Sequence, residues 1–197
     1  MSSNHSPTRD RILDATCQLV QEPGAATRMA DIARAAGVSR QAVYLHFENR
    51  ADLLTAAARH LDARHDLQGR LAPYRAAADA PEKLRRYIAF WGGYLPVIQG
   101  MARAFLAMRG TDAEARAAWS DRMAALREGC ETCIAALEQQ GLLAAGWTRG
   151  TAADLLWTQL SFETWEQLTG TCGWSTEDYI ARMQVQAERV FLRAASG

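Results

Sequence analysis

The stretch from Ser39 to Arg50 contains the side chains with the most distinctive chemistry, and their types suit contacts with nucleic acid. Ser39 can cap a helix, which would place Arg40, Gln41 and Ala42 in its first turn. In a major groove, arginine can bind guanine through two hydrogen bonds, glutamine can bind adenine, and an alanine methyl can contact a thymine methyl. Three residues further along have a spacing that suits phosphate contacts: Tyr44, His46 and Arg50.

Two short helices must position these side chains. The first is expected to begin at Thr27, whose hydroxyl and helix N-terminus would form an anion site, and to end at Gly37, which tolerates a left-handed backbone. The second covers residues 40–47. The small side chain of Ala33 allows a close crossing, and five apolar residues fall on inward faces: Ile32, Ala36, Val38, Val43 and Phe47. This pattern predicts a helix-turn-helix whose second helix would enter a DNA major groove.

A helical hairpin that serves only packing is the alternative. Residues 27–50 carry four arginines against Asp31 and Glu48, a net charge of +2. A net charge of +2 attracts a polyanion such as DNA only weakly. Two such units bound to one duplex would strengthen the attraction.

Several segments follow one another in a recognisable order: Ile12-Leu-Asp-Ala-Thr, Gly24, Thr27, Asp31-Ile-Ala, Ala36-Gly-Val-Ser and Val43-Tyr-Leu-His-Phe-Glu-Asn-Arg-Ala-Asp-Leu-Leu. In this order they resemble the tetracycline-repressor (TetR) family, over about residues 9–56. The resemblance implies a dimeric, ligand-responsive transcriptional regulator, usually a repressor.

By position, the resemblance implies base contacts from four residues: Arg28, Arg40, Gln41 and Ala42. It implies phosphate contacts from five: Thr27, Ser39, Tyr44, His46 and Arg50. Leu45 departs from the pattern, because a second aromatic residue often stands there. One backbone contact of the family therefore lacks its usual side chain.

The composition favours an all-α fold. The 197 residues include 38 alanines, the best helix former, and only five prolines. Apolar spacing predicts helices near residues 8–21, 27–36, 40–47, 50–70, 81–94, 96–108, 112–141, 148–171 and 175–195, with Pro96 as an interruption. We expect a helix-turn-helix DNA-binding domain at residues 1–48 and a ligand-binding and dimerisation domain at 49–197.

Other protein classes are not supported by the sequence. The first nine residues lack the apolar core of a signal peptide, and the longest uncharged run, 87–102, is shorter than the roughly 20 residues that span a bilayer. Four scattered cysteines do not form a disulfide framework, and the spacing of Cys130 and Cys133 is more typical of paired apolar positions on a helix than of a zinc half-site. We expect a cytoplasmic protein with no membrane contact, no cofactor and no metal.

Aromatic residues and methionines gather between residues 90 and 165, which suits a pocket for a hydrophobic or flat effector. Ordinary core packing is the alternative for each of them. Glu163, between Phe162 and Trp165, could hold a cation, although it could also be a solvated acid. The candidate ligand residues are Trp91, Tyr94, Phe105, Met108, Trp119, Met123, Trp157, Phe162 and Glu163.

The last two predicted helices carry broad apolar stripes and are expected to pair with those of a second copy in a four-helix bundle. The stripes comprise Leu155, Leu156, Gln159, Leu160 and Phe162 on one helix, and Tyr179, Ile180, Met183, Ala187, Val190, Phe191 and Ala194 on the other. The partners expected are thus a double-stranded DNA operator, a small-molecule effector and a second copy of the chain. An all-helical adaptor or enzyme without DNA binding is the alternative, although no nucleophile–base pair or phosphate-binding glycine loop is evident.

Overall fold

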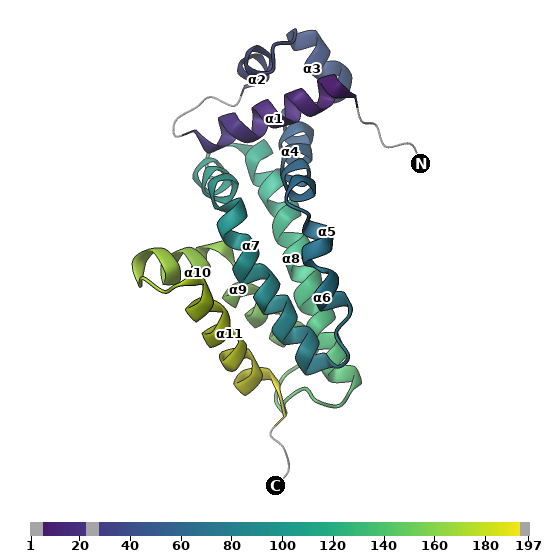
Figure 1. The fold of residues 1–197 in the computed structure, drawn as a ribbon, viewed down its shortest axis with the longest axis vertical. Helices are drawn as coiled ribbons and strands as arrows, with labels where there is room; N and C mark the ends of the chain where they lie inside the picture. The colour runs from purple at the N-terminus through teal and green to yellow at the C-terminus, as the bar shows by residue number, and fades with distance from the viewer. Residues whose placement is uncertain (1–5, 23–27, 194–197) are drawn as a thin grey trace. The chain divides into compact units, whose positions relative to one another are not determined.

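The computed structural model describes residues 6–22 and 28–193, and these residues form helices joined by short turns (Figure 1). In chain order the helices are α1 (Pro7–Gln21), α2 (Met29–Ala35), α3 (Arg40–His46), α4 (Arg50–Arg64), α5 (Leu67–Arg70), α6 (Ala72–Arg75), α7 (Ala80–Met108), α8 (Ala113–Gln139), α9 (Arg149–Gln159), α10 (Phe162–Glu166), the π-helix η1 (Gln167–Thr171) and α11 (Thr176–Phe191). The all-α prediction is confirmed. No helix within the described ranges is both long and apolar enough to cross a membrane.

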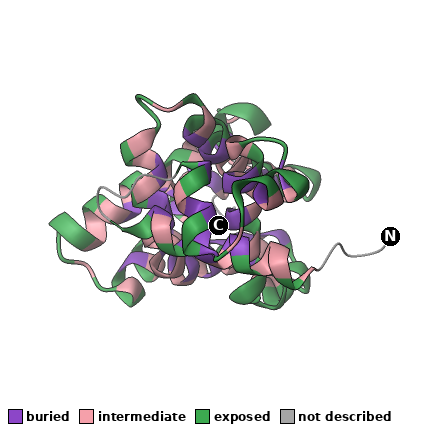
Figure 2. Ribbon diagram, turned by 90° about the horizontal axis from the view of Figure 1, so that it is seen from above, coloured by how far each residue is buried: buried purple, intermediate pink, exposed green. Residues whose placement is uncertain are grey.

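The chain divides into two compact units. Unit 1 comprises Met1–Leu67 and Ile98–Arg122, and unit 2 comprises Gln68–Val97 and Met123–Gly197. Buried residues lie on the inward sides of the helices and exposed residues on their outward sides (Figure 2).

Unit 1 begins with a core that joins α1 to α2, α3 and α4. Ile12, Ile32, Val43 and Leu53 come from these four helices and are fully buried. Phe47, directly after α3, is 2% exposed, and the guanidinium carbon of Arg9 lies 5.1 Å from its ring centroid. The predicted inward face of the hairpin is confirmed for every residue except Val38, which is half-buried.

Polar contacts add a second link between α1 and α4. The Nε2 atom of His60 lies 2.9 Å from a carboxylate oxygen of Asp14, and Arg64 pairs with the same oxygen. The carboxyl of Asp14 is partly desolvated, which raises its pKa, but the contacts with His60 and Arg64 outweigh this and lower the pKa below its usual value.

Helix α7 runs through Pro96, so the predicted interruption at this residue is wrong. A proline inside a helix removes one backbone hydrogen bond and costs about 3 kcal/mol. Tyr94 and Leu95 are buried beside it, and Gly92 lies so close to Ile180 that an added Cβ would be 2.3 Å from Cγ1. Burial of the flanking residues offsets the missing hydrogen bond, an effect that proline position alone does not reveal.

Unit 2 has an aromatic core on α7. The rings of Phe90 and Tyr94 are stacked with centroids 5.5 Å apart, and Trp91 packs edge-on against Tyr87 and Phe90. The Tyr87 hydroxyl donates to the Leu126 carbonyl on α8, with the two oxygens 2.9 Å apart.

Gly129 on α8 makes room for the Tyr87 ring, because an added Cβ would lie 2.0 Å from Oη and 2.4 Å from Cζ. Gly129→Ala is therefore expected to lower the free energy of unfolding by about 1–3 kcal/mol through overpacking. Gly93→Ala in α7 is the matched control, since nothing lies within 4 Å of its added Cβ. This control should gain up to about 1 kcal/mol from helix propensity. Urea unfolding of both variants gives the comparison, and stabilisation by both would contradict the packing described.

The predicted helix over 148–171 is divided in two. Thr148 caps α9 by accepting from the Thr151 amide, but Ser161 accepts from the Thr164 amide and begins α10. Ser161 can satisfy the first amides of a new helix, so the chain stops and restarts there. The predicted helix after Arg50 also ends early, at Arg64, and α5 and α6 follow it.

The apolar stripe of α11 faces the core of unit 2. Tyr179, Met183, Ala187 and Phe191 are buried, as are Leu156, Leu160 and Phe162 of the preceding helices. The assignment of these residues to a dimer surface is therefore wrong, because periodicity identifies an apolar face but not the surface that it packs against. Ile180, Val190, Leu155 and Gln159 are half-buried, and Ala194 lies outside the described residues.

Candidate nucleic-acid interface and effector residues

Helices α2 and α3 meet through a tight turn. Gly37 has a φ of 64°, which few other residues adopt readily, and the Val38 amide donates to the Ala33 carbonyl at 3.0 Å. Ser39 then accepts a hydrogen bond from the Ala42 amide at 3.1 Å, which confirms its predicted role as the N-cap of α3.

The outward face of α3 carries the side chains predicted to contact DNA. Arg40 and Gln41 are exposed, Ala42 is half-buried, and Val43 behind them is fully buried. The Arg40 guanidinium donates to the Tyr44 hydroxyl at 3.3 Å, and its central carbon lies 5.5 Å from the Tyr44 ring centroid. Leu45 is 80% exposed. The first turn of α3 therefore presents an exposed arginine, an exposed amide side chain and a half-buried alanine.

The remaining predicted contact residues lie around this face. Arg28 is exposed at the N-cap position of α2, and His46 is half-buried at the last position of α3. Thr27 lies outside the described residues. The N-cap of the first helix, predicted at Thr27, is Arg28 in the structure.

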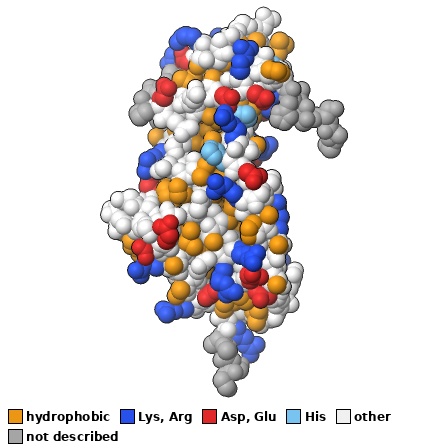
Figure 3. All heavy atoms as spheres, viewed as in Figure 1, with side chains coloured by type: hydrophobic (Ala, Val, Ile, Leu, Met, Phe, Trp, Pro, Cys, Tyr) orange, Lys and Arg blue, Asp and Glu red, His pale blue; other side chains and the backbone are white. Residues whose placement is uncertain are grey.

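A groove of about 510 Å³ runs beside α3 in unit 1. Its lining combines three arginines with two acids: Arg28, Met29, Ala30, Arg40, Tyr44, Glu48, Asn49, Arg50 and Glu114. Acidic and basic side chains are likewise interspersed on the surface shown in Figure 3. The weak positive charge noted in the sequence thus corresponds, in the lining of this groove, to a mixture of basic and acidic side chains.

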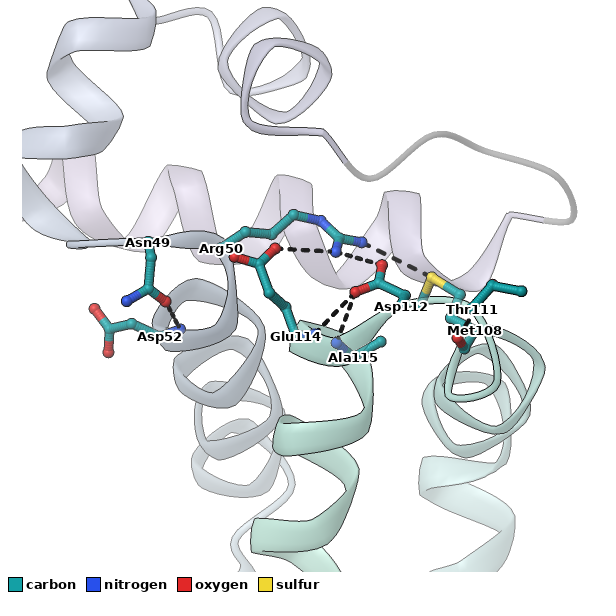
Figure 4. Close-up of polar contacts among 8 residues, drawn as sticks. All are labelled: Asn49, Arg50, Asp52, Met108, Thr111, Asp112, Glu114 and Ala115. Atoms are coloured by element: carbon teal, nitrogen blue, oxygen red, sulfur yellow. Dashed lines mark hydrogen bonds and ion pairs between the residues drawn. The ribbon is translucent and has the colours of Figure 1, made fainter.

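Arg50 occupies an environment that its position in the sequence did not reveal (Figure 4). Its side chain is only 14% exposed, and its Nη1 atom lies 2.5 Å from Asp112 Oδ2 and 3.4 Å from Glu114 Oε2. Its Nη2 atom lies 3.9 Å from the sulfur of Met108. The residue expected to hold a phosphate is therefore paired with carboxylates near the start of α8.

Asp112 has two roles in this cluster. Its Oδ1 atom accepts from the amides of Glu114 and Ala115, at 3.0 and 3.1 Å, and so caps α8. Partial burial by itself raises the pKa of Asp112, but the Ala115 amide and the Arg50 guanidinium lower it below the usual value. The carboxylate is therefore ionised at neutral pH.

The candidate effector residues are divided between the two units. Unit 1 holds Phe105 and Trp119, both buried, and Met108, which is half-buried. Unit 2 holds the other six: Trp91, Tyr94 and Phe162 are buried, Met123 and Trp157 are half-buried, and Glu163 is exposed. Trp91 and Tyr94 pack together with ring centroids 6.1 Å apart.

Unit 2 also contains buried polar atoms without a hydrogen-bond partner. These are the indole nitrogens of Trp91, Trp157 and Trp165 and the side-chain oxygen of Gln159. Trp157 and Gln159 lie on α9, and Trp165 lies on α10, directly before the π-helix η1. Short π-helical turns are frequent at functional sites. Sequence reasoning did not select Gln159 or Trp165 as candidate ligand residues, because the lack of a partner is visible only in three dimensions.

Three of the four cysteines are buried thiols, and only Cys172 is exposed among the described residues. Cys17, Cys130 and Cys133 are buried, and burial raises the pKa of Cys17 to about 11 and that of Cys133 to about 12. These thiols are protonated at neutral pH and unreactive. Within residues 6–22 and 28–193, no group of three or more His, Cys, Asp or Glu residues could hold a metal.

Comparison with known proteins assigns the N-terminal region. The model of bacterial regulatory proteins, tetR family, matches residues 12–57. The HTH-type transcriptional regulator TtgR of Pseudomonas putida is 38% identical over 78 residues, which cover 39% of this chain and 36% of TtgR. The chain therefore matches about a third of the length of this curated relative.

Two solved structures extend the likeness to the whole fold. The fatty acid degradation regulator FadR from Bacillus halodurans has a TM-score of 0.73 at 20% identity, covering 94% of this chain and 96% of FadR. NalD, the secondary repressor of the MexAB-OprM multidrug efflux pump in Pseudomonas aeruginosa, has a TM-score of 0.67 at 24% identity, covering 96% and 97%. Residues 12–57 therefore match the tetR family of bacterial regulatory proteins, and the chain as a whole shares the fold of these two solved structures.

Proposed function

We propose that this chain represses transcription by binding a palindromic operator through α3 and that a small molecule releases it. The observation that carries the proposal is the first turn of α3, where exposed Arg40 and Gln41 stand on a helix fixed by the Ser39 cap and the buried Val43. Such a helix places side chains at base edges in a major groove. Residues 1–48 would bind DNA, and 49–197 would bind the effector and the second protomer.

Binding to the upstream region of the chain's own gene tests this proposal. Fluorescence anisotropy at one fixed salt concentration would compare that duplex with a scrambled duplex of equal length. Specific regulators bind their sites about 10³–10⁷-fold more tightly than other DNA. Equal affinity for both duplexes would support the adaptor that uses its hairpin only for packing.

The effector is proposed to be a hydrophobic or aromatic molecule with a hydrogen-bond acceptor. Aromatic residues in unit 2 supply apolar area, and the unpartnered indole nitrogens of Trp157 and Trp165 can donate to that acceptor. A coupling of about 1–3 kcal/mol would weaken operator binding about 5- to 150-fold. A thermal-shift screen would find ligands, and anisotropy would measure their effect on DNA affinity. A ligand that saturates the protein without changing its DNA affinity is not the effector.

The outer face of α11 is proposed as part of the dimer surface. A groove of about 660 Å³ follows this face, and Val185, one of the residues that line it, is 47% exposed. Beside it, the guanidinium carbon of Arg182 lies 5.2 Å from the Trp174 ring centroid. A second copy related by a two-fold axis would cover Val185 and give two copies of α3 for one operator.

Val185→Asp is expected to weaken the dimer, because a charged side chain that loses its hydration at the interface replaces an apolar contact. Sedimentation equilibrium gives the dimer dissociation constant. Ala145→Asp introduces the same charge at an exposed position of unit 2 and should leave the constant unchanged. Unchanged association of Val185→Asp would exclude this face of α11 from the interface.

A further inference from the structure

We propose that Asp112 and Glu114 restrain DNA binding by competing with a phosphate for the Arg50 guanidinium. This inference rests on the proposed function, since it concerns the same DNA-binding surface. It makes the two acids positioning residues that act through Arg50 and have no direct contact with DNA.

The Arg50 guanidinium contacts three residues around the turn between α7 and α8. Asp112 Oδ2 lies 2.5 Å and Glu114 Oε2 lies 3.4 Å from the same Nη1 atom, while Met108 approaches Nη2 (Figure 4). With 14% of its side chain exposed, Arg50 is turned toward these carboxylates. It would have to exchange them to form a bidentate contact with a phosphate.

The groove beside α3 brings this cluster to the proposed DNA surface. Arg50 and Glu114 line the same groove as Arg40 and Tyr44, so a duplex that contacts α3 would lie next to both. Glu114 is 43% exposed there. A carboxylate on this surface repels phosphate and attracts the arginine that would neutralise it, so both effects oppose DNA binding.

The position of Arg50 in α4 makes the exchange chemically reasonable. Asn49 caps α4 by accepting from the Asp52 amide at 2.9 Å, and Arg50 is the first residue of the helix. A cation at a helix N-terminus is unfavourable by itself, and a nearby anion offsets the repulsion. Either a carboxylate or a phosphate can supply that anion, and Asp112 supplies it in the structure.

The substitution Asp112→Asn removes the negative charge of this residue but keeps a side chain that can cap α8. Asparagine caps helices as well as aspartate does, so the first turn of α8 should persist while the ion pair with Arg50 is lost. Binding of a mixed-sequence duplex by the full chain would be measured by anisotropy over a range of NaCl concentrations. For each additional phosphate that the variant contacts, the slope of log affinity against log salt concentration should become steeper by about 0.9. At 0.1 M salt, its affinity should be up to about eightfold higher than that of the wild type.

The double variant Arg50→Gln/Asp112→Asn isolates the competition from simple charge repulsion. If Asp112 acts through Arg50, its substitution has a smaller effect in the Arg50→Gln background, where only the repulsion of phosphate by the carboxylate is relieved. Asp121→Asn is the matched control, because Asp121 pairs with Arg59, another α4 arginine, at 3.1 Å and does not line the groove. This control should leave the slope unchanged.

Three results would overturn the inference: no tighter binding by Asp112→Asn, weaker binding, or an equal gain in the Arg50→Gln background. If Asp112→Asn unfolds, Glu114→Gln takes its place, with the same expected direction and the same double variant. A wild-type chain that does not bind the mixed duplex even at low salt would instead contradict the proposed function. The two failures are therefore distinguishable.

Discussion

Replacing Arg40 with alanine should weaken binding to the selected operator by about 1–3 kcal/mol in each half-site, because a bidentate contact with guanine has that value. The preference for one base pair per half-site should disappear at the same time. Arg40 is exposed in the first turn of α3, and its hydrogen bond to Tyr44 holds it on the outward face. Competition anisotropy with operators changed at single positions measures both effects.

Arg34→Ala is the matched control for the loss of charge. Its side chain is 79% exposed on α2, it pairs with Asp31, and it does not line the groove beside α3. This variant should affect all sequences equally and only slightly. If Arg40→Ala also weakened all sequences by the same factor, Arg40 would be a phosphate contact and not a reader of bases.

Phe47→Ala is expected to destabilise the chain by about 3–5 kcal/mol, the usual cost of removing a buried aromatic side chain. Phe47 is 2% exposed in the core behind α3 and lies next to the Arg9 guanidinium. Loss of this ring removes the support that orients the outward face of α3, so DNA affinity should fall as well. Urea unfolding gives the free energy, and anisotropy gives the affinity.

Leu45→Ala, two residues before Phe47 and inside α3, provides the comparison. Leu45 is 80% exposed, so its substitution should change the unfolding free energy by less than about 0.5 kcal/mol. A cost below about 1 kcal/mol for Phe47→Ala would show that the ring does not support the core of unit 1 as described.

The helix-turn-helix was predictable from sequence because its determinants are local. Ser39 caps α3 through the amide three residues later, and Gly37 has the positive φ that its position required. Val43 and Phe47 lie one helical turn apart and are both buried. Each of these features depends on neighbours within a few residues, where spacing and residue type contain enough information.

Features that depend on distant residues were not predictable. Arg50 and Asp112 are 62 positions apart, so nothing near Arg50 indicates its carboxylate partner. The continuation of α7 through Pro96 depends on packing, and the inward orientation of Tyr179 on α11 depends on which surface covers it. The periodicity of apolar residues describes each helix separately, so it does not indicate which residues of different helices contact each other.

Selection of binding sites from random DNA tests the central claim most directly. Two copies of α3 related by a two-fold axis should enrich an inverted repeat whose half-sites lie about one helical turn, roughly 34–36 Å, apart or a multiple of it. Wild-type protein should enrich this repeat, and Arg40→Ala should lose the preference at one base pair in each half. Enrichment of no sequence, or of a single asymmetric site, would contradict a dimeric regulator that reads bases through α3.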